Sequence, residues 1–81
     1  MIVYIEWEDA WTKWGWSHKD DLTDGLFPCK TIGFLVSEDD DVVLVAPSYS
    51  DRNETYGDVA NIPRANIKKY LEITVKTLED L

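Results

Sequence analysis

The sequence predicts a mainly β protein, a small five-stranded barrel that forms a single domain. Apolar residues alternate with polar ones or gather in short runs rich in Val, Ile and aromatic residues, which is typical of strands. Gly, Pro, Asp and Asn separate these segments and indicate turns. A chain of 81 residues has room for one small core, so we also consider a homo-oligomer, in which self-association adds burial.

The opening segment, residues 1–7, predicts a strand. Its side chains alternate with a period of two, which suits a strand better than a helix. Val3, Ile5 and Trp7 share one side of this strand, and we expect that side to face the core.

Residues 10–27 have no sustained period and predict a long loop. Ser17 and Asp20 have the spacing of a capping box, so "SHKDDL" predicts one helical turn inside the loop. The loop contains three tryptophans and cannot easily bury all of them, because indole is large and its N–H needs a partner. We expect Trp16, together with Trp7, to cover the core.

The next segment predicts a hairpin whose strands are Cys29–Ser37 and Val42–Tyr49. Asp39 to Asp41 lie between two apolar runs and are expected at the exposed tip, because aspartate accepts turn N–H groups and its charge deters pairing between sheet edges. The aspartates are adjacent, whereas a calcium loop needs oxygen ligands at alternating positions. No metal is expected at this tip.

The segment after Pro47 predicts a polar loop over residues 48–58 and then a short strand over residues 59–62. Pro63 has no N–H for a strand ladder, so this strand is expected to end there. Residues 63–66, "PRAN", predict one 3₁₀ turn.

Residues 67–75 predict the closing strand, with a short helix as the competing interpretation because several of these residues are good helix formers. If the segment is a strand, Ile67, Leu71 and Ile73 share one face with Lys69 and Val75. Residues 1–75 then form the barrel, and residues 76–81 are a tail or an oligomer contact.

Composition excludes several classes of function. The formal net charge is −8, which opposes direct binding to nucleic acid. The only cysteine is Cys29 and the only histidine is His18, so no disulfide framework, cysteine zinc site or strong catalytic constellation is predicted. No apolar run is long enough for a membrane span. We therefore expect a soluble, non-catalytic protein without a cofactor, in a reducing compartment such as cytoplasm.

Two resemblances add to this interpretation. "YGDVANIPRANI" resembles the end of Src-homology-3 (SH3-like) domains, where a 3₁₀ turn leads into the closing strand. "WEDA", "GW", "TIGFLVSEDDDVVLVA" and "YGDVANIPRANI", in that order, are similar to a group of small uncharacterised proteins of tailed bacteriophages. The first resemblance implies an SH3-like barrel, and the second implies a phage origin and action in the host bacterial cytoplasm.

Aromatic and acidic side chains are the candidate contact surface. Exposed tryptophans and tyrosines are enriched at the centres of interfaces, and an acidic rim suits a basic or amphipathic partner. The candidate partner-binding residues are Trp11, Trp14, Tyr49, Asp51, Glu54, Tyr56 and Asp58.

The function expected from these features is that of a phage accessory protein that binds a host protein and inhibits it, for example in host defence. The alternative is an oligomer that stacks a nucleotide between aromatic rings and sequesters it. Lys and Arg are few and scattered, and a phosphate site needs several cationic or N–H donors. The sequence therefore favours the protein-binding hypothesis, unless folding gathers Arg52, Arg64, Lys68 and Lys69.

Overall fold

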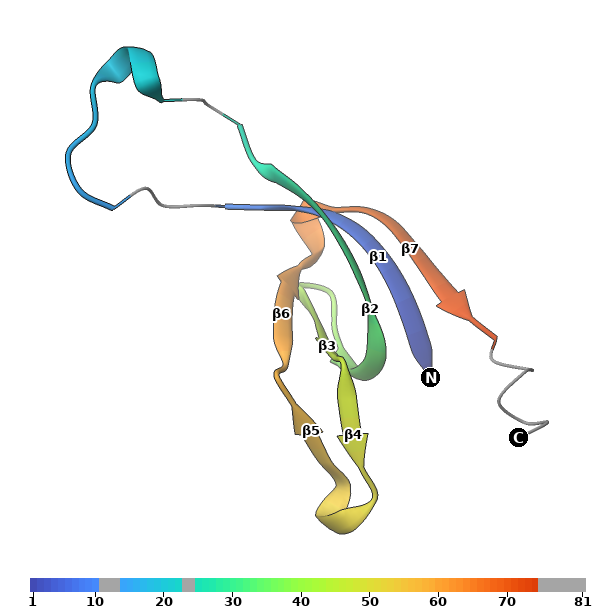
Figure 1. The fold of residues 1–81 in the computed structure, drawn as a ribbon. Helices are drawn as coiled ribbons and strands as arrows, with labels where there is room; N and C mark the ends of the chain where they lie inside the picture. Colours follow the sequence, from blue (N-terminus) through green and yellow to red (C-terminus); the bar gives the residue numbers. More distant parts are fainter. Residues whose placement is uncertain (11–13, 23–24, 75–81) are drawn as a thin grey trace.

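The structure, a computed structural model, describes residues 1–10, 14–22 and 25–74. It is mainly β (Figure 1), with one five-stranded antiparallel sheet in the order β6-β3-β2-β1-β7 and a two-stranded sheet of β4 and β5. The strands are β1 Ile2–Asp9, β2 Phe27–Glu38, β3 Val42–Ala46, β4 Ser48–Ser50, β5 Thr55–Gly57, β6 Ala60–Pro63 and β7 Ile67–Ile73. The 3₁₀ turns are η1 Lys19–Asp21, η2 Arg52–Glu54 and η3 Arg64–Asn66. Within the described ranges, no helix is long and apolar enough to cross a bilayer.

The mainly β class predicted from the sequence is confirmed, but strand pairing does not close the sheet into a barrel. β6 and β7 lie at opposite edges of the five-stranded sheet. β6 is short and ends at Pro63, which offers no N–H for further pairing. The likeness to an SH3-like barrel therefore stays a prediction.

The molecule is elongated. Its radius of gyration is 16.2 Å, whereas a compact domain of this length has a value of about 12 Å. The loop between β1 and β2 projects from one end of the sheet, and the β4–β5 hairpin projects from the other (Figure 1). Side chains in these two projections have little sheet against which to pack.

The core lies on one face of the five-stranded sheet, called the inner face here. Its fully buried members are Val3, Ile5, Val43, Val45 and Ile62. Trp7 packs against this cluster and donates an N–H bond from Nε1 to Thr31 Oγ1 at 2.9 Å. The prediction that alternate residues of the first strand face the core is confirmed.

The β2–β3 hairpin and its aspartate tip are also confirmed. Asp39 Oδ1 accepts N–H bonds from Asp41 and Val42, each at 2.8 Å. These two backbone donors favour the ionised carboxylate and lower the pKa of Asp39. The tip is thus an aspartate-capped turn.

The predicted 3₁₀ turn is present as η3, and it ties distant elements together. Asn66 Nδ2 donates a hydrogen bond to Glu8 O at 2.8 Å, which fixes the turn to the end of β1. The backbone N–H of Arg64 donates to Asp41 O at 2.9 Å, which fixes it to the hairpin tip.

A polar network also holds the hairpin tip to β7. Tyr70 Oη donates to Glu38 Oε2 at 2.7 Å. Arg64 Nε donates to Asp39 O at 2.6 Å, and its guanidinium lies 5.8 Å from the centroid of the Tyr70 ring. Desolvation, followed by the hydrogen bond to Glu38, raises the pKa of Tyr70 to about 12.

This network predicts an alkaline loss of stability. The neutral phenol is favoured in the folded state, so between pH 10.0 and about 12 the folded chain retains a proton that the unfolded chain has lost. The contribution of Tyr70 to the free energy of unfolding is complete below pH 10.0, and it falls as the pH rises through this range. We expect Tyr70→Phe to cost about 1 kcal/mol at pH 7 and to flatten this part of the profile, as measured by urea denaturation. Equal alkaline losses in the two proteins would contradict the assignment.

Residues 67–73 are strand β7, so the competing helix is wrong. Lys69, Leu71 and Ile73 share one face as predicted, but Ile67 lies on the other face, and Val75 lies outside the described residues. Tyr70 faces the core, whereas Leu71 is 47% exposed. The cause is a bulge: Glu6 pairs with Lys69 while Trp7 pairs with Ile67, so Lys68 has no opposite residue. One extra residue moves every later side chain to the other face.

Residues 48–58 are not a polar loop, because they contain the β4–β5 hairpin. Tyr49 lies opposite Tyr56, and such aromatic cross-strand pairs stabilise short ribbons. The strand predicted over Val42–Tyr49 is accordingly split. β3 ends at Ala46, and β4 begins after Pro47.

Trp16 does not cover the core: its side chain is fully exposed. The β1–β2 ribbon carries the loop away from the rest of the sheet (Figure 1), so the core on the inner face does not bury the indole. The helical turn in this loop is present as η1, but its N-cap is His18 instead of Ser17, with Nδ1 accepting from the Asp20 N–H at 3.4 Å. The predicted tail, residues 76–81, lies outside the described residues.

Candidate functional site

An aromatic pocket lies at the base of the β4–β5 hairpin. The ring centroids of Tyr49 and Tyr56 are 5.0 Å apart, and those of Phe34 and Tyr49 are 6.2 Å apart. The rings are tilted to each other, an arrangement that aromatic pairs prefer. The pocket has a volume of about 310 Å³ and is lined by Met1, Phe34, Leu35, Tyr49 and Tyr56.

Backbone pairing in both sheets positions these side chains. The register of β4 and β5 places Tyr49 directly opposite Tyr56. On the other side of the pocket, the Leu35 N–H donates to Met1 O at 2.9 Å and holds the start of the chain against β2. The pocket therefore has a sheet wall and a hairpin wall.

The hairpin that forms one wall is acidic. Asp51 and Glu54 lie at its tip, Asp58 follows β5, and all three are exposed. Glu54 and Asp58 have positive φ values of 49° and 56°, which glycine adopts more readily than an acidic residue. The hairpin, residues 48–58, carries acidic residues at its tip and directly after β5, and it is called the tyrosine hairpin below.

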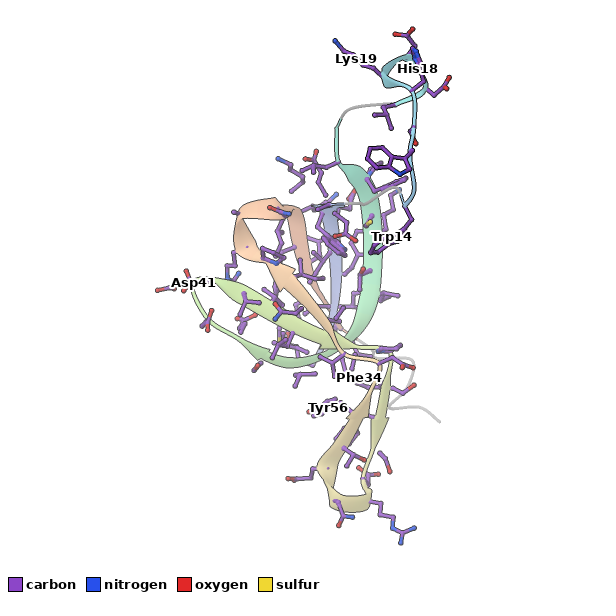
Figure 2. The ribbon with its side chains drawn as sticks, turned by 90° about the vertical axis from the view of Figure 1, so that its left-hand side faces the viewer. Trp14, His18, Lys19, Phe34, Asp41 and Tyr56 are labelled. Carbon is purple, nitrogen blue, oxygen red and sulfur yellow. The ribbon has the colours of Figure 1, made fainter. Side chains whose placement is uncertain are left out.

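The structure does not join all the sequence-predicted residues into one surface. Tyr49, Asp51, Glu54, Tyr56 and Asp58 are together on or beside the tyrosine hairpin. Figure 2 shows Trp14 apart from Tyr56, and the loop that carries Trp14 projects from the opposite end of the sheet to the hairpin (Figure 1). Trp11 lies outside the described residues.

The single patch of tryptophans and tyrosines predicted from the sequence is therefore wrong for Trp14. The prediction assumed a closed barrel, in which the first long loop lies beside the hairpin loops. In the open sheet, the loop continues the β1–β2 ribbon, while β4 leaves the sheet after β3 at the other end (Figure 1).

A second pocket, of about 330 Å³, lies where β1, β2 and β7 meet. Its lining residues are Glu6, Trp7, Glu8, Pro28, Cys29, Lys30 and Lys68. Its cations are matched by acids: Lys30 lies opposite Glu6, and Lys68 Nζ is 4.0 Å from Glu8 Oε2. This pocket has no surplus of positive charge for a phosphate.

Folding does not gather the basic residues that would favour a nucleotide. Arg52 lies in η2 at the tip of the tyrosine hairpin. Arg64 instead donates a hydrogen bond from Nε to Asp39 O, and its Nη2 lies 3.6 Å from Glu38 Oε2. Among the residues that the structure describes, no group of three His, Cys, Asp or Glu side chains is placed to hold a metal ion.

The sequence did not indicate three members of the aromatic pocket: Met1, Phe34 and Leu35. Phe34 and Leu35 are neighbours in β2 and point to opposite faces, so alternation assigns only one of them to the core. The sequence did contain one signal for the pocket: β2 has apolar residues on both faces. A strand with one solvated face carries polar residues on that face, so this pattern indicates a second covered surface.

A scan against protein-family profiles, a search of curated proteins and a search of solved structures each find no match to this chain, so the similarity to tailed-bacteriophage proteins stays a prediction.

Proposed function

We propose that the protein is a non-catalytic binding protein that holds a basic or amphipathic protein partner on the tyrosine hairpin. The observation that carries this proposal is the tilted aromatic pair of Tyr49 and Tyr56, which lines a pocket on a hairpin that also carries three exposed acidic residues. Each of these tyrosines is more than a third exposed although the two rings contact each other. A protein partner is the occupant that uses both the apolar and the acidic parts.

The two parts of the surface have different physical roles. An apolar side chain of the partner enters the pocket between the hairpin and β2, and the burial of aromatic area supplies most of the affinity. Lys or Arg residues around that side chain pair with Asp51, Glu54 and Asp58. These exposed charges act chiefly on the rate of encounter and on the choice of partner.

The proposed partner is a protein of the bacterial host. The resemblance to tailed-phage proteins supports action on a host protein in the bacterial cytoplasm. A net charge of −8 suits a protein that competes with nucleic acid or another anion for a basic site. Occupation of that site would inhibit the host protein without any reaction.

Capture from a bacterial lysate tests the proposal. We expect immobilised wild-type protein to retain one stoichiometric protein, and Tyr49→Ala and Tyr56→Ala each to weaken its binding by about 30-fold or more, the scale of an interface hot spot. Val59→Ala is the matched control, since Val59 is an exposed apolar residue outside the pocket. Retention that survives both tyrosine substitutions would exclude this surface, and a co-purifying nucleotide without any protein would support the sequestration alternative.

The salt dependence of the captured complex tests the acidic part. Between 0.01 M and 0.15 M salt the Debye length falls from about 30 Å to about 8 Å, so we expect association to slow more than dissociation accelerates. Reversing Asp51, Glu54 and Asp58 to Lys should reproduce this loss in stopped-flow kinetics. Asp40→Lys is the control for a single charge reversal, because Asp40 is exposed at the tip of the β2–β3 hairpin, away from the tyrosine hairpin. An association rate that is indifferent to salt would mean that recognition is apolar alone.

A further inference from the structure

The face of the sheet opposite the core carries an apolar patch. Register places Tyr4 between Ile32 and Leu71, and Ile2 beside Ile73. Ile32 is 59% and Leu71 is 47% exposed. We call these five residues the outer patch. Aliphatic and aromatic side chains gathered across three adjacent strands mark an interaction site more often than an ordinary surface.

The next row of the same face is charged. Glu6 lies between Lys30 on β2 and Lys69 on β7. This row has one more positive than negative charge, in a chain whose overall charge is −8. An occupant of the outer patch is therefore favoured if it is apolar and carries acidic residues at its border.

The loop between β1 and β2 has this chemistry. Trp14 is 89% exposed, and the Trp16 side chain is fully exposed. Asp20 and Asp21 lie in η1 of the same loop, together with Lys19. We call residues 14–22 the Trp loop. Two exposed indoles cost hydration free energy that a partner surface would recover.

The ribbon geometry keeps the Trp loop away from its own outer patch. Strands β1 and β2 remain paired out to Asp9 and Phe27. At the rise of a strand, Asp9 is about 17 Å beyond Tyr4. Figure 1 shows the loop between β1 and β2 projecting from the end of the sheet, and Figure 2 shows His18 and Lys19 at the far end of this projection. A second molecule can bring the two surfaces together without any change in the fold.

The accessible area supports a second copy as the occupant. The chain exposes 6704 Å², whereas a monomeric protein of 9.4 kDa exposes about 5,000 Å². The exposed area exceeds that expectation by about 1,700 Å². Half of this excess equals the roughly 800 Å² that each partner buries in a standard interface. An elongated chain with a small core gains much of its missing burial by association.

We propose that two copies associate by reciprocal exchange, with the Trp loop of each molecule packed on the outer patch of the other. Trp14 and Trp16 cover Ile32, Tyr4 and Leu71 of the second copy. The acidic residues of η1 then approach the Lys30–Glu6–Lys69 row. Such a contact is isologous, so it closes with a two-fold axis and does not propagate. It uses neither the tyrosine pair nor the acidic hairpin, so it stands independently of the proposed function.

Neutral substitutions and light scattering test the exchange. The loop variant is Trp14→Ser with Trp16→Ser, the patch variant is Ile32→Thr with Leu71→Thr, and Val59→Thr is the matched control. We expect wild-type protein and the control to approach twice the mass of one chain as concentration rises. Each double variant should raise the dimer dissociation constant by about 30-fold or more. Circular dichroism establishes that each variant is folded. A wild-type protein that stays monomeric at every concentration would overturn the proposal.

Mixing the two double variants distinguishes reciprocal exchange from the other symmetric contacts. The loop variant keeps an intact patch and the patch variant keeps an intact loop, so a mixed dimer retains one of the two contacts. We expect the mixture to associate more strongly than either variant alone. If only the patch variant dissociates, the dimer is formed by two outer patches in contact. If only the loop variant dissociates, it is formed by two Trp loops in contact. Either result, or a mixture without rescue, refutes the exchange.

Discussion

Ile5→Ala is expected to destabilise the protein by about 2–5 kcal/mol, the usual cost of deleting a buried aliphatic side chain and leaving a cavity. Ile5 is fully buried on the inner face, where the cluster has four other fully buried members among the described residues. A domain of this size has a total stability of about 4–12 kcal/mol. The substitution removes a large fraction of that stability and is readily measured by urea denaturation.

Val59→Ala is the control for this experiment, because Val59 is an aliphatic residue 46% exposed outside the cluster. A change within about 0.5 kcal/mol is expected there, as at other surface positions. Equal losses for the two variants would mean that the inner face is not the core.

Gly33→Ala is expected to cost about 1–3 kcal/mol, because its new methyl group has no space. A Cβ at this position would lie 2.5 Å from the backbone carbonyl oxygen of Ala46 and 3.0 Å from Val45 Cγ1. The carbonyl belongs to the neighbouring strand β3, which cannot retreat without disturbing the β2–β3 register. Thermal and urea unfolding both report the loss.

Gly57→Ala makes the same chemical change at a position with space. A Cβ there would meet Ser48 Cβ at 3.6 Å, an ordinary van der Waals distance. Because alanine restricts the unfolded chain more than glycine does, this variant should be neutral or slightly more stable. A loss at Gly57 as large as that at Gly33 would refute the steric explanation.

The features predicted correctly from the sequence depend on neighbouring residues. The tip at Asp39 and the 3₁₀ turn after Pro63 are fixed by hydrogen bonds and backbone restrictions within a few positions. The first strand followed from a period of two over a short segment. Such local preferences are present in the residues themselves, so they can be read without knowledge of the fold.

Two of the incorrect predictions, the face of Ile67 and the burial of Trp16, depend on distant parts of the chain. A bulge against β1 places Ile67 on the face opposite Leu71 and Ile73, and the side-chain pattern of residues 67–73 does not reveal where that bulge lies. The exposure of Trp16 follows from the direction of the β1–β2 ribbon. The β4–β5 hairpin was hidden by its polar composition, although Tyr49 and Tyr56 are residues that favour strands.

The candidate site was predicted in part for the same reason. The acidic residues and the tyrosines lie within one short hairpin, so their chemistry and their proximity are both visible in the sequence. Phe34 and Met1 reach the pocket through strand pairing, which the sequence does not specify. The placement of Trp14 at the other end required the open topology of the sheet.

Calorimetric titration with the captured partner tests the separation of the two surfaces most directly. The wild-type protein, Tyr56→Ala and Trp14→Ala are compared at a concentration below that of self-association. We expect Tyr56→Ala to weaken binding by about 30-fold or more, while Trp14→Ala binds as the wild type does. Loss of binding in Trp14→Ala with normal binding in Tyr56→Ala would show that the partner meets the Trp loop and would contradict the assignment of the tyrosine hairpin.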